Sequence, residues 1–231
     1  MIERVVVTGA QGGIGSACVD GFRDLGAEVI GVDLVEGSPE DLLLDLSDPD
    51  CGSQLLAHLA GRSVDVLVNN AAMGFSGEAV DTDAAEFDRL IAVNLRAPFL
   101  LSAALYPSLR QRSGAVVNVS SVHAVATSSR VSVYAASKGG LVSLTRALAL
   151  EWAPEVTVNC VLPGAVDTEM LTDGLFRAGA TVESFGERTP AKRVAQPSEI
   201  AQAVLFLATN RFTTGAALVV DGGASARLST E

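Results

Sequence analysis

The sequence predicts an α/β protein with a doubly wound, mostly parallel sheet and helices on both of its faces. Short apolar runs rich in β-branched residues alternate with longer segments of helical periodicity along the whole chain. Several of these runs are apolar throughout, which is typical of parallel strands buried on both faces. Strands that alternate with helices are joined by right-handed crossovers, and that connectivity gives a doubly wound sheet.

Seven strands and six helices follow from this pattern. The predicted strands are Arg4–Thr8, Glu28–Asp33, Asp41–Leu46, Asp65–Asn69, Gly114–Ser120, Val156–Val161 and Ala216–Val220. The predicted helices cover residues 13–25, 52–60, 82–93, 98–111, 133–152 and 197–208. Thr82, with Glu86 after it, and Ser198 are suited to cap two of these helices, and Pro197 marks a helix start.

Two connections depart from the regular alternation. The stretch 34–44 is short for a crossover and contains Gly37 and Pro39, so we expect at most a vestigial helix there. The stretch 164–196 is long, contains several glycines and is weakly periodic, which favours a lid or substrate-binding loop, with a disordered segment as the alternative. Neither stretch is a domain linker, and the sequence has no internal repeat. We therefore expect a single domain over residues 1–231.

Composition argues against several classes of partner and site. The formal net charge is −11, which disfavours nucleic acid or an anionic membrane, because phosphate binding needs clustered Lys and Arg. Cys18, Cys51 and Cys160 lack metal-ligand spacing and suggest no disulfide framework, so we expect buried thiols and no metal. The N-terminus lacks the pattern of a secretion signal, and no uncharged apolar run approaches the length of a membrane span. The expected compartment is the cytoplasm.

The glycine-rich turn TGAQGGIG predicts a dinucleotide site. Its glycines lie where the first strand passes into a helix, and they would let the backbone approach a pyrophosphate at the helix N-terminus. The spacing is G-x-x-x-G-x-G, and no Walker lysine follows it. A tight turn alone also needs glycine, so the prediction depends on the position of the turn directly after the first strand.

Asp33, at the end of the second predicted strand, favours NAD(H) over NADP(H). A carboxylate there can accept hydrogen bonds from the adenosine ribose hydroxyls and would repel a 2′-phosphate. Leu34, Val35 and Glu36 follow it, and Gln11 lies in the glycine turn, so this segment has no cation to hold that phosphate. The alternative is an aspartate that only caps a turn or a helix.

Tyr134 and Lys138 form the predicted reactive pair. They lie four residues apart, on one face of a predicted helix, in a chain with only two tyrosines and two lysines. An ammonium beside the phenol would lower the pKa of Tyr134 from about 10, and together with the charge of an oxidised nicotinamide it would bring that pKa toward neutrality. Ser121 would hold a substrate oxygen, and Asn94, at the end of the helix before LRAPFL, would position a water. The plain alternatives are that Asn94 only ends a helix and that Ser121 only ends a strand, where Ser120 competes with it.

These motifs resemble those of the short-chain dehydrogenases/reductases over essentially the whole chain. The resemblance rests on TGAQGGIG, Asp33, VNNAA, Asn94, VVNVSS, YAASK, VNCVLPGAVDT and TGAALVVDGG. It implies a Rossmann-type fold with a seven-stranded sheet and the catalytic set Asn94, Ser121, Tyr134 and Lys138, with Tyr134 as the acid/base. It also implies a homotetramer, with a dimer as the alternative, whose interfaces use the helices 98–111 and 133–152 and the last strand.

The resemblance further implies which residues contact the cofactor and the substrate. The cofactor set is Gly9, Gly12, Gly13, Ile14, Gly15, Asp33, Asp45, Leu46, Asn70, Ala71, Tyr134, Lys138, Pro163, Val166 and Thr168. Within it, Thr168 and the backbone around Val166 would hold the nicotinamide carboxamide. The expected substrate pocket is Phe75, His123, Val125, Met170 and Leu171, with His123 as pocket wall rather than proton carrier. One departure is Ala72, where the family usually has glycine.

We therefore expect an NAD(H)-dependent oxidoreductase that interconverts a secondary alcohol and a ketone or aldehyde. Its small-molecule substrate would be largely apolar. One alternative is a 3-oxoacyl-thioester (acyl-carrier-protein) reductase, which Asp33 and the acidic charge disfavour because that role usually goes with NADPH and a basic docking surface. A second alternative is a non-catalytic protein that senses the dinucleotide and regulates a partner.

Overall fold

The computed structural model describes residues 2–177 and 181–226, and its centre is one seven-stranded sheet. The strand order is β3-β2-β1-β4-β5-β6-β7, and every neighbouring pair is parallel. The strands are β1 (Arg4–Thr8), β2 (Glu28–Asp33), β3 (Leu42–Leu43), β4 (Val66–Asn69), β5 (Ala115–Val119), β6 (Thr157–Pro163) and β7 (Ala217–Val220). The prediction of a doubly wound α/β fold is confirmed.

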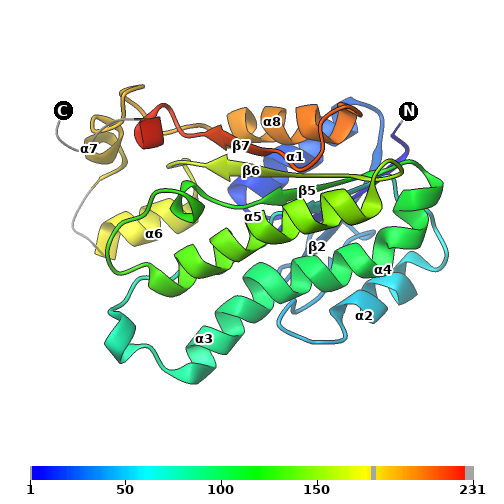
Figure 1. Ribbon diagram of the computed structural model, residues 1–231, viewed down its shortest axis with the longest axis horizontal. Helices are drawn as coiled ribbons and strands as arrows, with labels where there is room; N and C mark the ends of the chain where they lie inside the picture. Colours follow the sequence, from blue (N-terminus) through cyan, green and yellow to red (C-terminus); the bar gives the residue numbers. More distant parts are fainter. Residues whose placement is uncertain (1, 178–180, 227–231) are drawn as a thin grey trace.

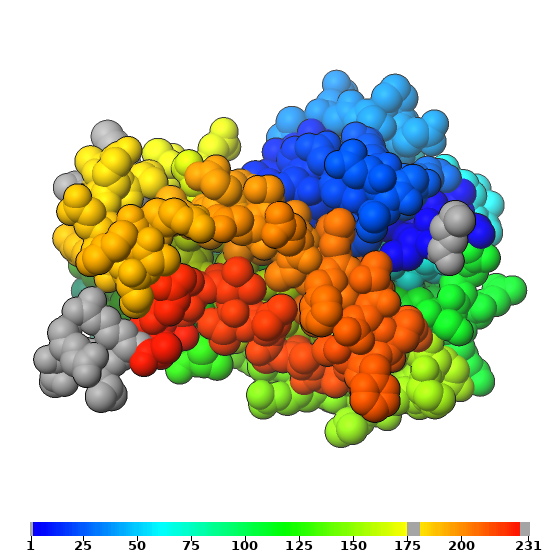
Figure 2. All heavy atoms as spheres, turned by 90° about the horizontal axis from the view of Figure 1, so that it is seen from above, coloured from blue at the N-terminus to red at the C-terminus, as the bar shows by residue number. Residues whose placement is uncertain are grey.

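Helices cover both faces of this sheet (Figure 1). The α-helices are α1 (Gly13–Asp24), α2 (Cys51–Leu59), α3 (Ala84–Ile91), α4 (Ala97–Gln111), α5 (Ser132–Trp152), α6 (Glu169–Arg177), α7 (Val182–Gly186) and α8 (Pro197–Thr209). One-turn segments are η1 (Ala79–Asp81), η2 (Ala92–Arg96), η3 (Val122–Ala124) and η4 (Ala224–Ala226). Helices α1 and α8 lie against each other on one face, as Figure 2 shows in blue and orange, and α2, α4 and α5 cover the other.

Alternate strand residues build two apolar cores, one on each face. Val5 and Val7 of β1 belong to the core under α1 and α8, whereas Val6 between them belongs to the core under α2, α4 and α5. All three are fully buried, which explains why the strand reads as a continuous apolar run. Cys18, Cys51 and Cys160 are buried and free, as expected from their spacing.

One long helix passes through Asn94 instead of ending there. Residues Ala84–Gln111 are continuously helical, and η2 inside them is a π-turn that contains Asn94. Pro98 has no N–H, so the usual hydrogen bond to the carbonyl of Asn94, four residues earlier, is missing, and the helix widens there. The prediction that a helix ends at Asn94 is therefore wrong. By length and composition this helix could cross a membrane, but Leu101 and Leu105 pack into the core; the cytoplasmic location stays a prediction.

Helix starts and short elements show four further differences. Asp83, not Thr82, caps α3, with its carboxylate accepting the N–H of Glu86. Gln196 caps α8 instead of Ser198, although Pro197 is its first residue as predicted. Strand β3 is only two residues long, because the side chain of Asp41, not its backbone, bonds to β2. The segment 164–196 is not a plain loop, since it contains α6 and α7. That the whole chain is a single domain stays a prediction.

Candidate active site

The residues proposed from the sequence gather at the carboxyl edge of the sheet. All strands are parallel, so the segments that follow β1, β4, β5 and β6 meet at the same edge. The glycine turn follows β1, Asn70 follows β4, Ser121 follows β5, and Thr168 lies beyond β6. Asp33 ends β2 on the same edge. This edge is where open α/β sheets bind their ligands.

The glycine turn forms a cradle that side chains would fill. A Cβ on Gly15 would overlap the carbonyl oxygen of Gly9, so the turn closes only with glycine at this place. Gly12 caps α1 without any side-chain hydrogen bond, which leaves the backbone N–H groups of the first turn without a capping side chain. Uncapped N–H groups at a helix N-terminus fit a pyrophosphate. The residues present therefore fit a dinucleotide.

Asn70 and Ala71 hold this turn from the end of β4. The amide of Asn70 donates to the carbonyl oxygens of Thr8 and Gly9 at 2.9 and 3.1 Å. The hydroxyl of Thr8 accepts the backbone N–H groups of Asn70 and Ala71, each at 3.0 Å. The structure thus gives Asn70 a clear structural task, and its predicted contact with the cofactor stays a proposal.

Replacing Gly15 by alanine is expected to abolish the dinucleotide cradle. The new methyl group meets a backbone carbonyl, which cannot rotate away, so we expect a loss of about 1–3 kcal/mol of stability from overpacking. Dissociation constants for NADH, measured by fluorescence titration, should rise by more than about tenfold. Gly174→Ala is the matched control, because its Cβ would enter open space. Unchanged NADH affinity in Gly15→Ala would contradict the assignment.

Asp33 is oriented by two backbone donors. Its two carboxylate oxygens accept the N–H groups of Gln11 and Leu34 at 2.9 and 2.7 Å. The side chain therefore lies against the glycine turn, where an adenosine ribose is expected. Asp45 is exposed, and a hydrogen bond from Ser47 lowers the pKa of its carboxyl group. The side chain of Leu46 belongs to the apolar core, so only its backbone is free to face a ligand.

The other predicted cofactor residues lie close to the start of α1. A Cβ on Gly13 would come within 2.9 Å of the methyl group of Thr168, so Thr168 borders the cradle. Val166 is buried and forms an isolated bridge with Ala195. Ile14 packs on the core beneath α1, and Pro163 is the buried last residue of β6.

Lys138 is a buried cation beside Tyr134. Its ammonium Nζ lies 5.7 Å from the centroid of the Tyr134 ring and donates to the carbonyl oxygen of Val119 at 2.9 Å. The residue is only 2% exposed. Loss of water around the ammonium lowers the pKa of Lys138 to about 8. The two side chains lie on one face of α5, as their spacing predicts.

The phenol of Tyr134 has a raised pKa in this structure. Burial raises the pKa of the phenol, and the hydrogen bond with Ser121 offsets only part of that increase. In the protein without a bound dinucleotide, Tyr134 is therefore a neutral proton donor at neutral pH. Of the two neighbouring serines, Ser121 is therefore the candidate for the site. The hydroxyl of Ser120 is buried and donates to the carbonyl oxygen of Lys138.

Asn94 acts as a clamp in this structure. Its side-chain oxygen accepts the N–H of Met73 at 2.8 Å, and its amide donates to the carbonyl oxygen of Met73 and to the hydroxyl of Ser137. Ser137 in turn donates to the carbonyl oxygen of Tyr134 at 2.7 Å. Ser137 was not predicted as a site residue, although its place between Tyr134 and Lys138 could have indicated it. Both amide hydrogens of Asn94 are thus engaged by protein atoms.

Two of the expected substrate-pocket residues lie next to the site. His123 is half-buried, with its ring edge-on to Tyr134 at 5.9 Å between centroids, and burial lowers its pKa. Met170 of α6 lies against Gly74, since a Cβ on Gly74 would come within 4 Å of the Met170 side chain. Phe75 and Leu171 are half-buried, and Val125 is exposed. In the part of the chain that the structure describes, no group of three or more His, Cys, Asp or Glu side chains could hold a metal ion.

The chain is similar to many known oxidoreductases. A family model described as enoyl-(acyl carrier protein) reductase matches residues 9–225. A protein of Sinorhizobium fredii described as an uncharacterized short-chain type dehydrogenase/reductase is 40% identical over 95% of this chain, which spans 43% of that relative. A 3-oxoacyl-[acyl-carrier-protein] reductase of Thermotoga maritima is 33% identical over 94% of this chain and 96% of its own.

Solved structures similar to this chain also include dehydrogenases. The ligand-free aldohexose dehydrogenase of Thermoplasma acidophilum has a TM-score of 0.93, with 32% identity, over 99% of this chain and 96% of that chain. A 4-hydroxyisoleucine dehydrogenase complexed with NADH has 28% identity and a TM-score of 0.89 over 98% and 100% of the two chains. A protein of Beutenbergia cavernae, described as a putative NAD(P) dependent gluconate 5-dehydrogenase with NADP bound at low occupancy, has 33% identity and a TM-score of 0.90 over 97% of each chain. These neighbours therefore include both cofactors.

Proposed function

The chain belongs to the short-chain dehydrogenases/reductases, a family of NAD(P)-binding oxidoreductases, and we propose that it interconverts a secondary alcohol and a ketone or aldehyde with NAD(H). The observation that carries this proposal is the joint placement of Tyr134, Ser121 and Lys138. A phenol whose pKa is influenced by the neighbouring Ser121 hydroxyl lies beside a buried ammonium, at the sheet edge that holds the glycine cradle. Function here is argued from this site and not from the fold.

The side chains divide the proton chemistry among themselves. Ser121 and Tyr134 bind the carbonyl oxygen of the substrate, and Tyr134 donates its proton to that oxygen in reduction or accepts one in oxidation. Lys138 stabilises negative charge on the phenol, and Asn94 with Ser137 fixes the backbone on which Tyr134 stands. A bound nicotinamide dinucleotide supplies or accepts the hydride. The proposed cofactor is NAD(H), because Asp33 faces the ribose site and no cation accompanies it in the stretch that follows.

A substrate screen tests this function. Initial rates would be measured with NAD⁺ on a panel of secondary alcohols and with NADH on the matching ketones and aldehydes. We expect turnover in at least one class, with kcat/KM higher for NADH than for NADPH. Tight NADH binding without turnover on any panel member would favour the sensing alternative.

A thioester reductase is the second candidate, because a relative 33% identical carries that name. The discriminating substrate is a 3-oxoacyl thioester, offered both free and on acyl carrier protein. The net charge of −11 would repel an acidic carrier protein, so we expect poor turnover of the carrier-bound form. Efficient turnover with NADPH would reverse the ranking.

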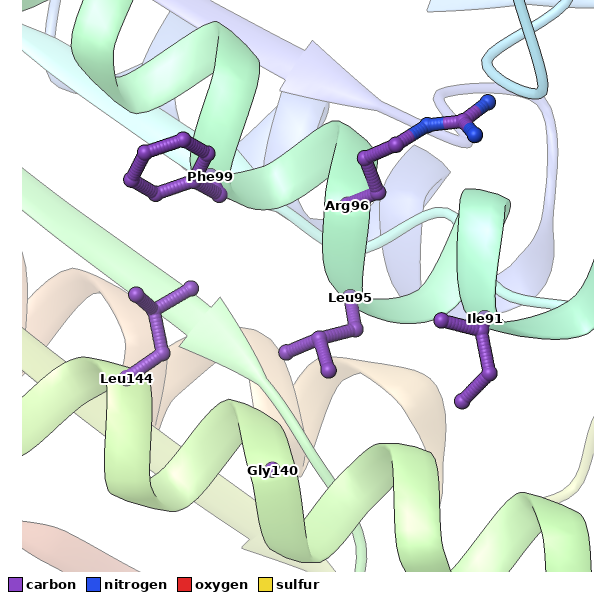
Figure 3. Close-up of a pocket in the computed structure, with 6 residues that line it drawn as sticks. All are labelled: Ile91, Leu95, Arg96, Phe99, Gly140 and Leu144. Atoms are coloured by element: carbon purple, nitrogen blue, oxygen red, sulfur yellow. The ribbon is translucent and has the colours of Figure 1, made fainter. Parts of the chain in front are cut away.

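We also propose a homo-oligomer that uses the face of α4 and α5. A shallow apolar hollow of about 380 Å³ lies between these helices, and Figure 3 shows Phe99, Leu95 and Leu144 around it. Phe99 is 47% exposed, and Leu150 farther along α5 is 85% exposed. Exposed apolar side chains on one face are typical of an interface. A tetramer is the favoured state and a dimer is the alternative.

Replacing Phe99 by glutamate is expected to lower the mass of the assembly, since a charge at an apolar contact is unpaired when buried. Light scattering after gel filtration would measure the mass. Val80→Glu is the control, because Val80 is exposed on η1, away from this hollow. A monomeric wild-type protein would disprove the proposal.

A further inference from the structure

A second carboxylate, that of Asp41, lies beside the glycine turn. Its oxygen Oδ1 accepts the backbone N–H of Gly31 in β2 at 2.7 Å. Its oxygen Oδ2 accepts the N–H of Ser38 at 2.8 Å and the side-chain amide of Gln11 at 3.3 Å. Three neutral donors from three segments therefore fix this carboxylate in place.

Gln11 is held between this carboxylate and that of Asp33. The backbone N–H of Gln11 donates to Asp33 at 2.9 Å, while its side chain donates to Asp41. Both acidic groups are thus bonded to the same residue of the turn that cradles the pyrophosphate. Only Gln11 lies between the two negatively charged carboxylates, at the place where the adenosine ribose is expected.

The short connection between β2 and β3 allows the Asp41 carboxylate to contact Gln11. A Cβ on Gly37 would overlap the amide nitrogen of Gln11 and the Oδ2 of Asp41, so Gly37 leaves room for their contact. A full crossover helix is absent here, and Asp41 stands directly before β3 instead. The compact connection brings its acidic group back onto the turn.

Neither charge is neutralised in the described part of the chain. None of the ion pairs there includes Asp33 or Asp41. From Gly9 to Asp41 the only basic residue is Arg23, in the last turn of α1. A ribose 2′-phosphate carries about −1.5 to −2 charges at pH 7. It would therefore face two carboxylates and no cation.

We propose that Asp41 is a second selectivity residue of the adenosine-ribose site, which with Asp33 disfavours NADP(H). The proposal rests on the proposed function, because it assumes a dinucleotide in the glycine cradle. Asp33 accepts hydrogen bonds from the ribose hydroxyls and repels a 2′-phosphate. Asp41 also repels the 2′-phosphate, but binding of the ribose hydroxyls does not require it. Removing the charge of Asp41 therefore weakens discrimination and largely spares NADH binding.

The test compares binding of the two reduced cofactors to the full-length protein. Dissociation constants for NADH and NADPH would be measured by fluorescence titration, with Asp41→Asn beside the wild type. We expect the NADPH-to-NADH ratio of dissociation constants to fall by about tenfold, while that for NADH changes by less than about threefold. Glu40→Gln is the matched control, since it removes the adjacent charge, which pairs with Arg62 and does not contact the turn. Its ratio should stay within about twofold of wild type.

Ionic strength gives a second readout that needs no variant. Raising the salt concentration screens exposed charges, so the wild-type ratio should fall between low and high salt. The fall should be smaller in Asp41→Asn, whose charge is already gone. Should Asp41→Asn fail to fold in a thermal unfolding scan, Asp41→Ser takes its place with the same expected ratio.

The outcomes separate two failures. A wild type that binds neither dinucleotide would overturn the proposed function. A wild type that binds NADH, together with equal ratios in Asp41→Asn and Glu40→Gln, would overturn the role of Asp41 alone.

Discussion

Replacing Tyr134 by phenylalanine is expected to lower kcat by about 10²–10⁴-fold and to leave the dissociation constant for NADH within about twofold of wild type. The variant loses the proton donor but keeps the ring that packs edge-on to His123. Steady-state rates on the best substrate of the screen, with a fluorescence titration of NADH, measure both quantities. The effect is large because, in the proposed mechanism, the Tyr134 hydroxyl meets the substrate oxygen, whereas the Lys138 ammonium donates to the carbonyl oxygen of Val119.

Tyr106→Phe is a matched control for this change. Tyr106 is the other tyrosine of the chain, and its ring packs on Trp152 with 4.7 Å between centroids. Removal of its hydroxyl should leave kcat within about twofold. Equal rates for wild type and Tyr134→Phe would rule out the proposed mechanism.

The pH dependence of carbonyl reduction follows from the same two groups. Burial raises the pKa of Tyr134, so the phenol stays protonated and able to donate at neutral pH. Lys138 loses its proton as the pH rises through about 8, and with it the charge that stabilises the phenolate. The rate of reduction is therefore expected to fall as the pH rises above 8.

Replacing Lys138 by methionine is expected to stabilise the protein while removing its activity. The fall of the Lys138 pKa from 10.5 to about 8 means that the folded protein holds the ammonium at a cost. At about 1.4 kcal/mol per pKa unit, that cost is on the order of 3 kcal/mol at pH 7. A methionine side chain fills the same space without a charge, so Tm should rise by roughly 5–10 °C. The kcat should fall by at least about 10²-fold.

The sign of this effect can be checked through pH. Below about pH 8 the lysine is charged in both the folded and the unfolded chain, and the full cost is present. Between about 8 and 10.5 the unfolded chain binds more protons, so wild-type stability rises with pH and the difference from Lys138→Met shrinks. Lys192→Met is the control, because Lys192 is exposed and should show no such gain. A less stable Lys138→Met at pH 7 would show that the ammonium stabilises the fold.

Much of the fold and the candidate site could be predicted because the signals are local. The spacing of Tyr134 and Lys138 places them on one face of any helix, and the structure has them on α5. The glycine turn could be predicted between β1 and α1 because the close approach of Gly15 to the carbonyl oxygen of Gly9 requires a glycine, and glycines are visible in the sequence. Apolar runs gave the strands of the sheet, since both faces are buried.

What the sequence did not show depends on long-range contacts. The contacts of the Asn94 side chain with Met73 and Ser137 join residues that are far apart along the chain, so local spacing could not predict them. The pKa of Tyr134 depends on burial, whose raising effect outweighs the lowering effect of Ser121. Asp41 could not be assigned because its partners, Gly31 and Gln11, become neighbours only when β2 and the turn are in place.

The order of the strands separates the proposed adenosine-ribose site from the proposed proton-transfer groups along the chain. Strands β1, β2 and β3, with the glycine turn, Asp33 and Asp41, are complete by residue 43. They form one side of the sheet, and β4 to β7 with Ser121, Tyr134 and Lys138 extend it on the other. The first fifth of the chain is thus a module whose exchange between relatives would carry the choice of dinucleotide with it. Such a chimera would keep its substrate and change only the source of its reducing power.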